Sequence, residues 1–175
     1  VKHVIWGRAC YIVPWQDESL LVGATSEDVG FDERATVAGV RDLLLQRGDE
    51  TLAGVRREMR RSMEDGAGIY RDEQGTRATC EKIAELRQRY GSIEVNDKSN
   101  VFNTDLFQVL ELGSMLDCAS ALTVGALARK ESRGAHQRTD HPERDDARYL
   151  AHSLAHRRDD GARIDYLPVT ITRWP

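Results

Sequence analysis

The stretch ESRGAHQRTDHPERDD, residues 131–146, holds the side chains of this sequence that are best suited to chemistry. Three arginines and two histidines alternate there with five carboxylates. This set would permit proton transfer, with Arg133 or His136 as the donor and Asp145 or Asp146 orienting it. It would equally permit a structural role, because arginines and carboxylates at this density pair with one another and with the last carbonyl groups of a preceding helix. Composition alone favours the structural network.

The histidines raise the question of a metal centre. His136 and His141 are five residues apart, and His152 and His156 are four apart. Zinc needs three or four ligands that are held in place by further hydrogen bonds. No cysteine lies near these histidines, and the second pair falls in a segment with the pattern of a strand. The sequence therefore predicts no metal site.

A glycine-rich loop that binds phosphate is the third possibility. The nearest candidate is DGAGIY, residues 65–70, which lacks a third glycine and follows a predicted helix where a strand is required. The loop is better explained as the end of that helix. The nearby run RREMRR, residues 56–61, fits a solvated helix face, and the residues that would bind a cofactor stay unidentified.

Overall composition limits the class of protein and its partners. The chain has 175 residues, 40% hydrophobic and 31% charged, and a net charge of −4, which is typical of a globular protein and argues against nucleic acid or an anionic membrane as a partner. Its three cysteines are scattered, so no disulfide framework is expected. The start of the sequence lacks the pattern of a signal peptide. We expect a cytoplasmic location.

The elements that must position the charged stretch are predicted by periodicity. Residues 10–14 and 20–24 have the composition of two strands of a hairpin, and residues 36–46 that of a helix. Next come an apolar stripe at helical spacing, ending near Gly66, and a second helix that Asp72 would cap and Gly91 would end. Asp49 is a candidate cap of the first of these two helices.

A longer helix is expected from about residue 103 to residue 130. It is apolar almost all round, which predicts the most buried helix of a bundle, and its acidic residues argue against a membrane span. Residues 152–157 and 163–171 have the pattern of strands on either side of a DDG turn. The predicted fold class is α+β: a three-helix bundle with a small C-terminal β-hairpin tail, preceded by an N-terminal β-hairpin and helix.

Residues 48–175 resemble the C-terminal region of the flavoprotein subunit of succinate dehydrogenase and fumarate reductase. The resemblance rests on ordered motifs: VRREMRRSMEDGAGIYR, LRQRY, VFNTDLFQVLELGSMLDCASAL, GALARKESRGAH and the ending DYLPVTITRWP. L-aspartate oxidase shares ESRGAH and the helices, but its ending fits less well. The resemblance implies an FAD-dependent oxidoreductase that interconverts succinate and fumarate and passes electrons to an iron–sulfur partner.

Residues 1–46 resemble a different family, the glycine oxidases of the D-amino-acid oxidase group. YIVP, LLVGAT and EDVGFD carry this second resemblance. It implies that Tyr11 belongs to a substrate pocket, while Trp15 replaces an arginine that is frequent after YIVP. The sequence thus predicts two domains, residues 1–47 and residues 48–175, joined as a chimera.

The first resemblance also implies what this chain lacks. The family's flavin fingerprint and catalytic residues lie upstream of the matched region and have no counterpart here, so no catalytic residue is assigned and no FAD is expected to bind this chain alone. The motif residues would support the site from outside. They are Glu131, Ser132, Arg133, His136, Arg138 and Asp140.

Three functions follow as hypotheses. The first is a piece of a succinate dehydrogenase or fumarate reductase flavoprotein without turnover of its own, bound to a flavin domain or an iron–sulfur subunit at the cytoplasmic face of a membrane. The second is a non-catalytic interaction module, in which exposed Met59 and Met63 would bind a partner or a second copy. The third is an amine oxidase that uses the N-terminal strands.

Overall fold

The structure is a computed structural model that describes residues 5–6, 11–14, 20–22, 33–99, 101–158 and 161–171. Three antiparallel strands, β1 (Ile5–Trp6), β2 (Tyr11–Pro14) and β3 (Leu20–Val22), form a sheet in the order β1-β2-β3. Val13 pairs with Leu21, as the predicted hairpin requires. The side chain of Tyr11 lies outside the described part of the chain, so its assignment to a substrate pocket stays a prediction.

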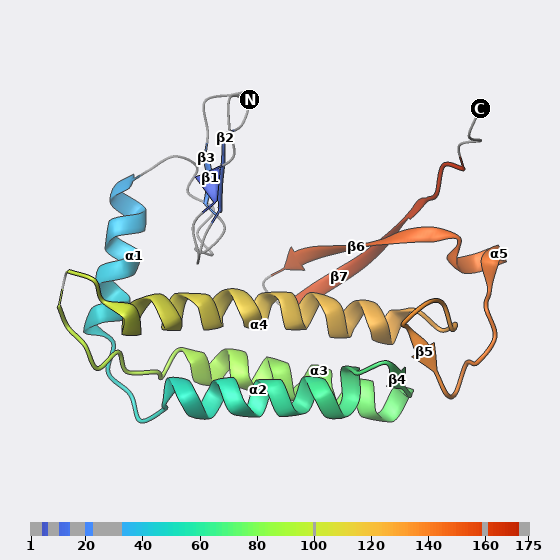
Figure 1. The fold of residues 1–175 in the computed structure, drawn as a ribbon, viewed down its shortest axis with the longest axis horizontal. Coiled ribbons are helices and arrows are strands. Elements are labelled where there is room, and N and C mark those ends of the chain that lie inside the picture. The colour runs from blue at the N-terminus through green and yellow to red at the C-terminus, as the bar shows by residue number, and fades with distance from the viewer. Residues whose placement is uncertain are drawn as a thin grey trace. The chain divides into compact units, whose positions relative to one another are not determined.

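Four helices of at least 13 residues follow, and they are labelled in Figure 1. They are α1 (Glu33–Leu45), α2 (Leu52–Ala67), α3 (Glu73–Tyr90) and α4 (Thr104–Ala128). Asp72 caps α3 as predicted, because its Oδ1 accepts a hydrogen bond from the Gly75 amide at 2.6 Å. The predicted Asp49 cap is wrong: Thr51 Oγ1 accepts the Gly54 amide at 3.2 Å and caps α2, since Thr51 directly precedes the first helical residue.

The C-terminal part is a hairpin of β6 (Ala151–Arg158) and β7 (Gly161–Pro168). Eight residue pairs join the strands in antiparallel register, from Ala151 with Pro168 to Arg158 with Gly161, which confirms the predicted tail. Three short elements were not predicted, namely β4 (Tyr70–Arg71), β5 (Gln137–Arg138) and α5 (Asp146–Tyr149). They are too short to give a periodic pattern.

The chain divides into two compact units. The first comprises Val1–Arg56 and Arg87–Leu116, and the second Arg57–Leu86 and Asp117–Pro175. Parts of α2, α3 and α4 contribute to each unit. Among the residues whose side chains the structure describes, the core of the first unit contains the fully buried Val55, Ile93, Val95, Val109, Leu112 and Leu116. The core of the second contains Met59, Ala67, Ile83, Leu86, Ala119 and Ala126.

In the second unit, α2 and α3 approach each other closely at Gly66. A Cβ atom at this position would lie 2.2 Å from Thr79 Oγ1 and 2.6 Å from the Gly75 carbonyl oxygen. Thr76 and Thr79 donate hydrogen bonds to the carbonyl groups of Gly66 and Ser62, at 3.2 and 3.3 Å. Gly66 therefore serves helix packing, and the DGAGIY segment is the end of α2.

Two expectations about apolar surfaces are corrected. Met59 is 4% exposed and belongs to the core, so it offers no surface to a partner. Conversely α4 is not buried on all sides, because Phe107 and Leu122 are 55% and 49% exposed. Apolar composition alone does not indicate which face of a helix is buried by the other elements of this chain. By length and composition α4 could cross a membrane, a test that core helices of soluble proteins also pass.

Candidate functional site

The charged stretch forms a loop that begins after α4 and ends in α5, all within the second unit. The loop is attached to the α2–α3 connection by a parallel pair, β4 with β5, in which Tyr70 opposes Gln137 and Arg71 opposes Arg138. Gly134 makes the turn, with a φ of 56° that favours glycine, and Arg133 and His136 exchange backbone hydrogen bonds across it at 2.8 and 3.0 Å. The segment thus has a defined conformation without being a helix or a long strand.

Glu131 is the centre of the first ion network. Its side chain is fully buried and accepts hydrogen bonds from Arg129 Nη1 at 2.5 Å, from Arg133 Nε at 2.8 Å and from the Asp145 amide at 2.8 Å. Burial by itself would raise the pKa of Glu131, but the bonds from Arg133, Asp145 and Arg129 outweigh it and hold the pKa below its ordinary value. The carboxylate is ionised and saturated with donors.

Asp146 extends this network to the surface. Its carboxylate accepts a hydrogen bond from Arg133 Nη2 at 2.5 Å. It also accepts two hydrogen bonds from the Arg144 guanidinium, at 2.7 and 2.8 Å. These bonds, those from Arg144 first, lower the pKa of Asp146 to about 2. The same carboxylates raise the pKa of Arg133. Asp145 is also occupied, since its Oδ1 accepts the Arg148 amide at 3.1 Å and caps α5.

Arg138 is the centre of the second network and ties the loop to the end of α4. It is 1% exposed and binds Asp140 through two hydrogen bonds of 2.7 Å each. Its Nη1 faces the carbonyl oxygens of Ala126 and Arg129 at 3.4 and 3.2 Å, where the negative end of the helix dipole favours a cation. The Arg138 fork holds the pKa of Asp140 well below its ordinary value.

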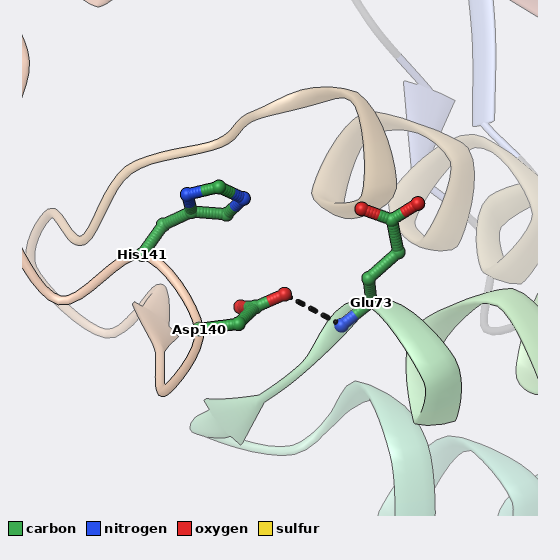
Figure 2. Close-up of side chains that lie close together, drawn as sticks. All are labelled: Glu73, Asp140 and His141. Carbon is green, nitrogen blue, oxygen red and sulfur yellow. Dashed lines mark hydrogen bonds between the residues drawn. The ribbon is translucent and has the colours of Figure 1, made fainter.

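Asp140 in turn binds the beginning of α3. Its Oδ2 accepts the backbone N–H of Glu73 at 2.9 Å, which Figure 2 shows as a dashed line. Ser132 completes the loop: its hydroxyl accepts the Arg138 amide at 2.8 Å and donates to the His141 carbonyl at 2.9 Å. One end of α4 and one end of α3 are therefore connected through side chains of a single loop.

His136 lies between the arginines. Its Nδ1 is 2.8 Å from Arg71 Nη1, and its Nε2 is 3.0 Å from the Arg129 carbonyl oxygen. Because a guanidinium only donates, Nδ1 must accept, so the proton of a neutral ring resides on Nε2. Burial lowers the pKa of His136, and the charges of Arg71, Arg138 and Arg129 lower it further. The ring is neutral at pH 7.

These contacts argue against the proton-transfer interpretation. Arg133 and His136, its possible donors, and Asp145 and Asp146, its possible orienting groups, each bind a neighbour within the loop or its anchoring elements. A general acid or base must reach a substrate, and its protons or lone pairs must be available. Within the described residues, each of the six motif residues makes hydrogen bonds inside the loop or to its anchoring elements, and their supporting role stays a prediction.

A possible metal group is present at the edge of the second network. Glu73, Asp140 and His141 each place a ligand atom within 4.8 Å of the others (Figure 2). However, both oxygens of Asp140 are bound to Arg138, and the Glu73 carboxylate lies 2.7 Å from Arg77 and 3.4 Å from Lys130. A metal ion would have to displace these cations. We therefore assign the carboxylates of Glu73 and Asp140 to the ion network, which His141 joins only through its backbone carbonyl, the acceptor of the Ser132 hydroxyl.

Sequence reasoning missed two members of the site, Arg71 and Glu73. Arg71 lies 65 residues before its partner His136, and Glu73 lies 67 residues before its partner Asp140, and neither has a distinctive spacing. The only available signal was the polar connection between two predicted helices, which is a position where a distant loop can dock. His152 and His156 do not join the networks; His156 lies 3.5 Å from Asp165 on the hairpin.

Comparisons with known proteins connect this loop and its helices to one group. The family described as "Fumarate reductase flavoprotein C-term" matches residues 56–175. The fumarate reductase flavoprotein subunit of Mycobacterium tuberculosis is 50% identical over 129 residues, which are 73% of this chain and 22% of that protein. That of Haemophilus influenzae is 50% identical over 138 residues, covering 78% of this chain and 23% of that protein.

The fold is also found in solved structures. The Escherichia coli quinol fumarate reductase matches with a TM-score of 0.75 and 45% identity, covering 81% of this chain and 26% of the other. The chain therefore spans about a quarter of the length of the proteins it matches. These relatives do not test the glycine-oxidase resemblance of the first 46 residues, which stays a prediction.

Proposed function

The chain belongs to the family of fumarate reductase flavoprotein C-terminal regions, and from this premise we propose that it is the structural C-terminal domain of an FAD-dependent oxidoreductase that interconverts succinate and fumarate. The observation that carries the proposal is the fully paired state of the family motif. Glu131 and Arg138 are buried, and their partners connect α3, α4 and the loop. Such a domain stabilises a flavoprotein without contributing a reacting group.

The beginning of α3 and the position of Gly66 do not fit the pyrophosphate of FAD. A flavin pyrophosphate needs free backbone amides, typically at the beginning of a helix. The first amides of α3 are already bound by carboxylates, that of Glu73 by Asp140 and that of Gly75 by Asp72. Gly66 is packed against Gly75 and Thr79. We therefore expect the FAD to be held by residues outside the described part of this chain.

The boundary of the domain is part of the proposal. Residues 48–175 number 128 of the 175, so a match that covers 81% of the chain extends to some residues upstream of position 48. Contacts in the first unit support this extension: Gln46 Nε2 donates to the Ile93 carbonyl at 2.7 Å, and Arg47 pairs with Glu94 at 2.7 Å. We propose that the flavoprotein-like domain begins upstream of residue 47, with α1 included.

Partners and location follow as proposals from the same premise. An iron–sulfur subunit would receive the electrons, and the assembly would lie at the cytoplasmic face of a membrane. The names of the relatives support a subunit of a larger enzyme, since they are flavoprotein subunits of fumarate reductase and succinate dehydrogenase. A similar solved structure, a quinol-fumarate reductase with menaquinol molecules, supports a membrane-associated assembly.

A domain graft tests the proposed function. Residues 33–175, which include α1, would replace the corresponding C-terminal region of the M. tuberculosis relative, and bound flavin and succinate oxidation with an artificial electron acceptor would be measured. We expect the graft to retain flavin and turnover, and the present chain alone to be colourless and inactive. A graft carrying Arg138→Met is the matched control, expected to lose both. A folded graft without flavin would contradict the proposal.

A further inference from the structure

The surroundings of His136 are complementary to the neutral ring. Arg71 Nη1 lies 2.8 Å from Nδ1, and the Arg129 carbonyl oxygen lies 3.0 Å from Nε2. A guanidinium only donates and a carbonyl only accepts, so both contacts are hydrogen bonds when the proton is on Nε2 alone. A second proton, on Nδ1, would place two N–H groups and two positive charges opposite each other at 2.8 Å.

The charged groups that act on this ring are cations from three directions. In the part of the chain that the structure describes, Arg71 belongs to β4, Arg138 to β5, and Arg129 follows directly after α4. The neighbouring carboxylates of the loop and of α3 bind these arginines and not the ring: Glu131 binds Arg129, while Asp140 and, at 4.0 Å, Glu73 lie against Arg138. A protonated ring would therefore be repelled without a counter-ion among the described residues.

The contact between His136 and Arg71 lies beside the pairing of β4 with β5. Two backbone hydrogen bonds join the same segments, from the Gln137 amide to the Ile69 carbonyl at 3.1 Å and from the Thr139 amide to the Arg71 carbonyl at 2.8 Å. Arg71 is held in place, because its Nε donates to the Gly68 carbonyl at 2.5 Å. Repulsion from a charged ring would therefore act on the β4–β5 pair.

The other attachments of the loop respond only to a lower pH. The pKa of Asp146 is about 2, and the pKa values of Asp140 and Glu131 are also held below their ordinary values. These carboxylates stay ionised at pH 5, so Asp140 continues to bind Arg138 and the Glu73 amide. A proton on His136 would thus affect one side of the loop and leave the two ion networks intact.

We propose that His136 is a pH-dependent switch: uptake of a proton by its ring releases β5 from β4, while the ion networks keep the loop on α3 and α4. In the open form the ring would bind a proton with an ordinary pKa of about 6.5, whereas the closed form resists it. The open form therefore gains population as the pH falls through this value and loses it as the pH rises. The inference goes beyond the proposed function and does not depend on it.

Amide hydrogen exchange of the whole chain tests the switch. After correction for the intrinsic pH dependence of exchange, the protection of the Gln137 and Thr139 amides should fall about tenfold between pH 7 and pH 5. Exchange at these two amides should not respond to low concentrations of urea, since a local opening exposes little surface. Unchanged protection, or exchange that accelerates with urea as that of core amides does, would overturn the proposal.

A variant without a titrating side chain provides the first control. His136→Gln can still accept from Arg71 and donate to the Arg129 carbonyl, so it should keep the protection found at pH 7 and lose the tenfold fall. His156→Gln, on the hairpin, is the matched control and should behave like the unchanged chain. A fall that persists in His136→Gln would assign the opening to another group and refute the switch.

A second variant tests the contact itself. Arg71→Met removes the cation that faces Nδ1, so the His136 ring, followed by NMR, should titrate at a higher pH than in the unchanged chain. Arg60→Met, at an exposed position of α2, should leave this titration unchanged. The same titration in Arg71→Met as in the unchanged chain would contradict the proposal. If Arg71→Met does not fold, the exchange measurement on His136→Gln decides.

Discussion

Glu131 is the residue whose loss should affect this protein most. Glu131→Gln keeps the shape of the side chain but removes the charge between Arg129 and Arg133, both of which donate to it. Breaking a buried pair leaves an uncompensated charge, so we expect a loss of about 3 kcal/mol in the free energy of unfolding. Urea denaturation followed by circular dichroism measures it. Glu143→Gln, at an exposed site of the same loop, should change stability by less than about 0.5 kcal/mol.

His136 gives a second prediction, in mildly acidic solution. Its pKa in the folded protein is lowered, so the unfolded state binds a proton first as the pH falls below about 6.5. The free energy of unfolding should therefore decrease between pH 7 and pH 5. His136→Gln should remove this part of the pH dependence, whereas His156→Gln on the exposed hairpin should retain it. Identical slopes for the two variants would show that His136 is not the titrating group.

Asp140 and Asp146 should determine how the stability of the protein changes at lower pH. The pKa of Asp146 is about 2 in the folded protein, and that of Asp140 is also lowered, against about 4 in an unfolded chain. Their contribution is complete above about pH 4 and is lost as the pH falls toward the folded values. We expect Tm to fall steeply between pH 4 and pH 2. Thermal unfolding of Asp140→Asn at a series of pH values checks this prediction. Its Tm should already be lower at pH 7 and should fall less steeply between pH 4 and pH 2.

At the scale of elements, the space around two helical glycines makes opposite predictions for their replacement by alanine. Gly66→Ala would place a Cβ atom against Thr79 and the Gly75 carbonyl, and should destabilise the protein by about 1–3 kcal/mol. Gly125→Ala lies within α4, where the nearest atom is Ile164 Cδ1 at 3.8 Å, and should stabilise it by about 1 kcal/mol. Thermal unfolding of both variants compares them directly. Equal effects would contradict the close crossing.

The helices and strands also show which parts of the fold could be predicted from the sequence alone. Helices α1 to α4 and the β6–β7 hairpin follow from apolar periodicity and from caps such as Asp72, because these signals are local. The pairing of β4 with β5 places Tyr70 opposite Gln137, and no local sequence pattern predicts this pairing. The motif indicated an ion network, but the assignment of Arg71 and Glu73 to it depends on that distant pairing. The exposed face of α4 was missed because composition does not reveal what this chain leaves uncovered.

At the scale of the whole molecule, both compact units are built from parts of α2, α3 and α4. Each of these helices begins in one unit and continues into the other. Unfolding one unit should therefore remove helical structure that the other requires. We predict a single cooperative transition in urea, with coincident curves from circular dichroism and from hydrogen exchange of core amides. Two separated transitions would show that the units unfold independently.

The parallel β4–β5 pair has a consequence for the order of events during synthesis. Its two strands lie far apart in the sequence, and the ion networks close only when the segment up to Asp146 is available. Contacts between such distant segments form late, after local helices have already appeared. A ribosome would thus release all three bundle helices before the loop that connects them can close. Until then the nascent helices have exposed apolar faces, and the networks can form only after the segment up to Asp146 has been translated.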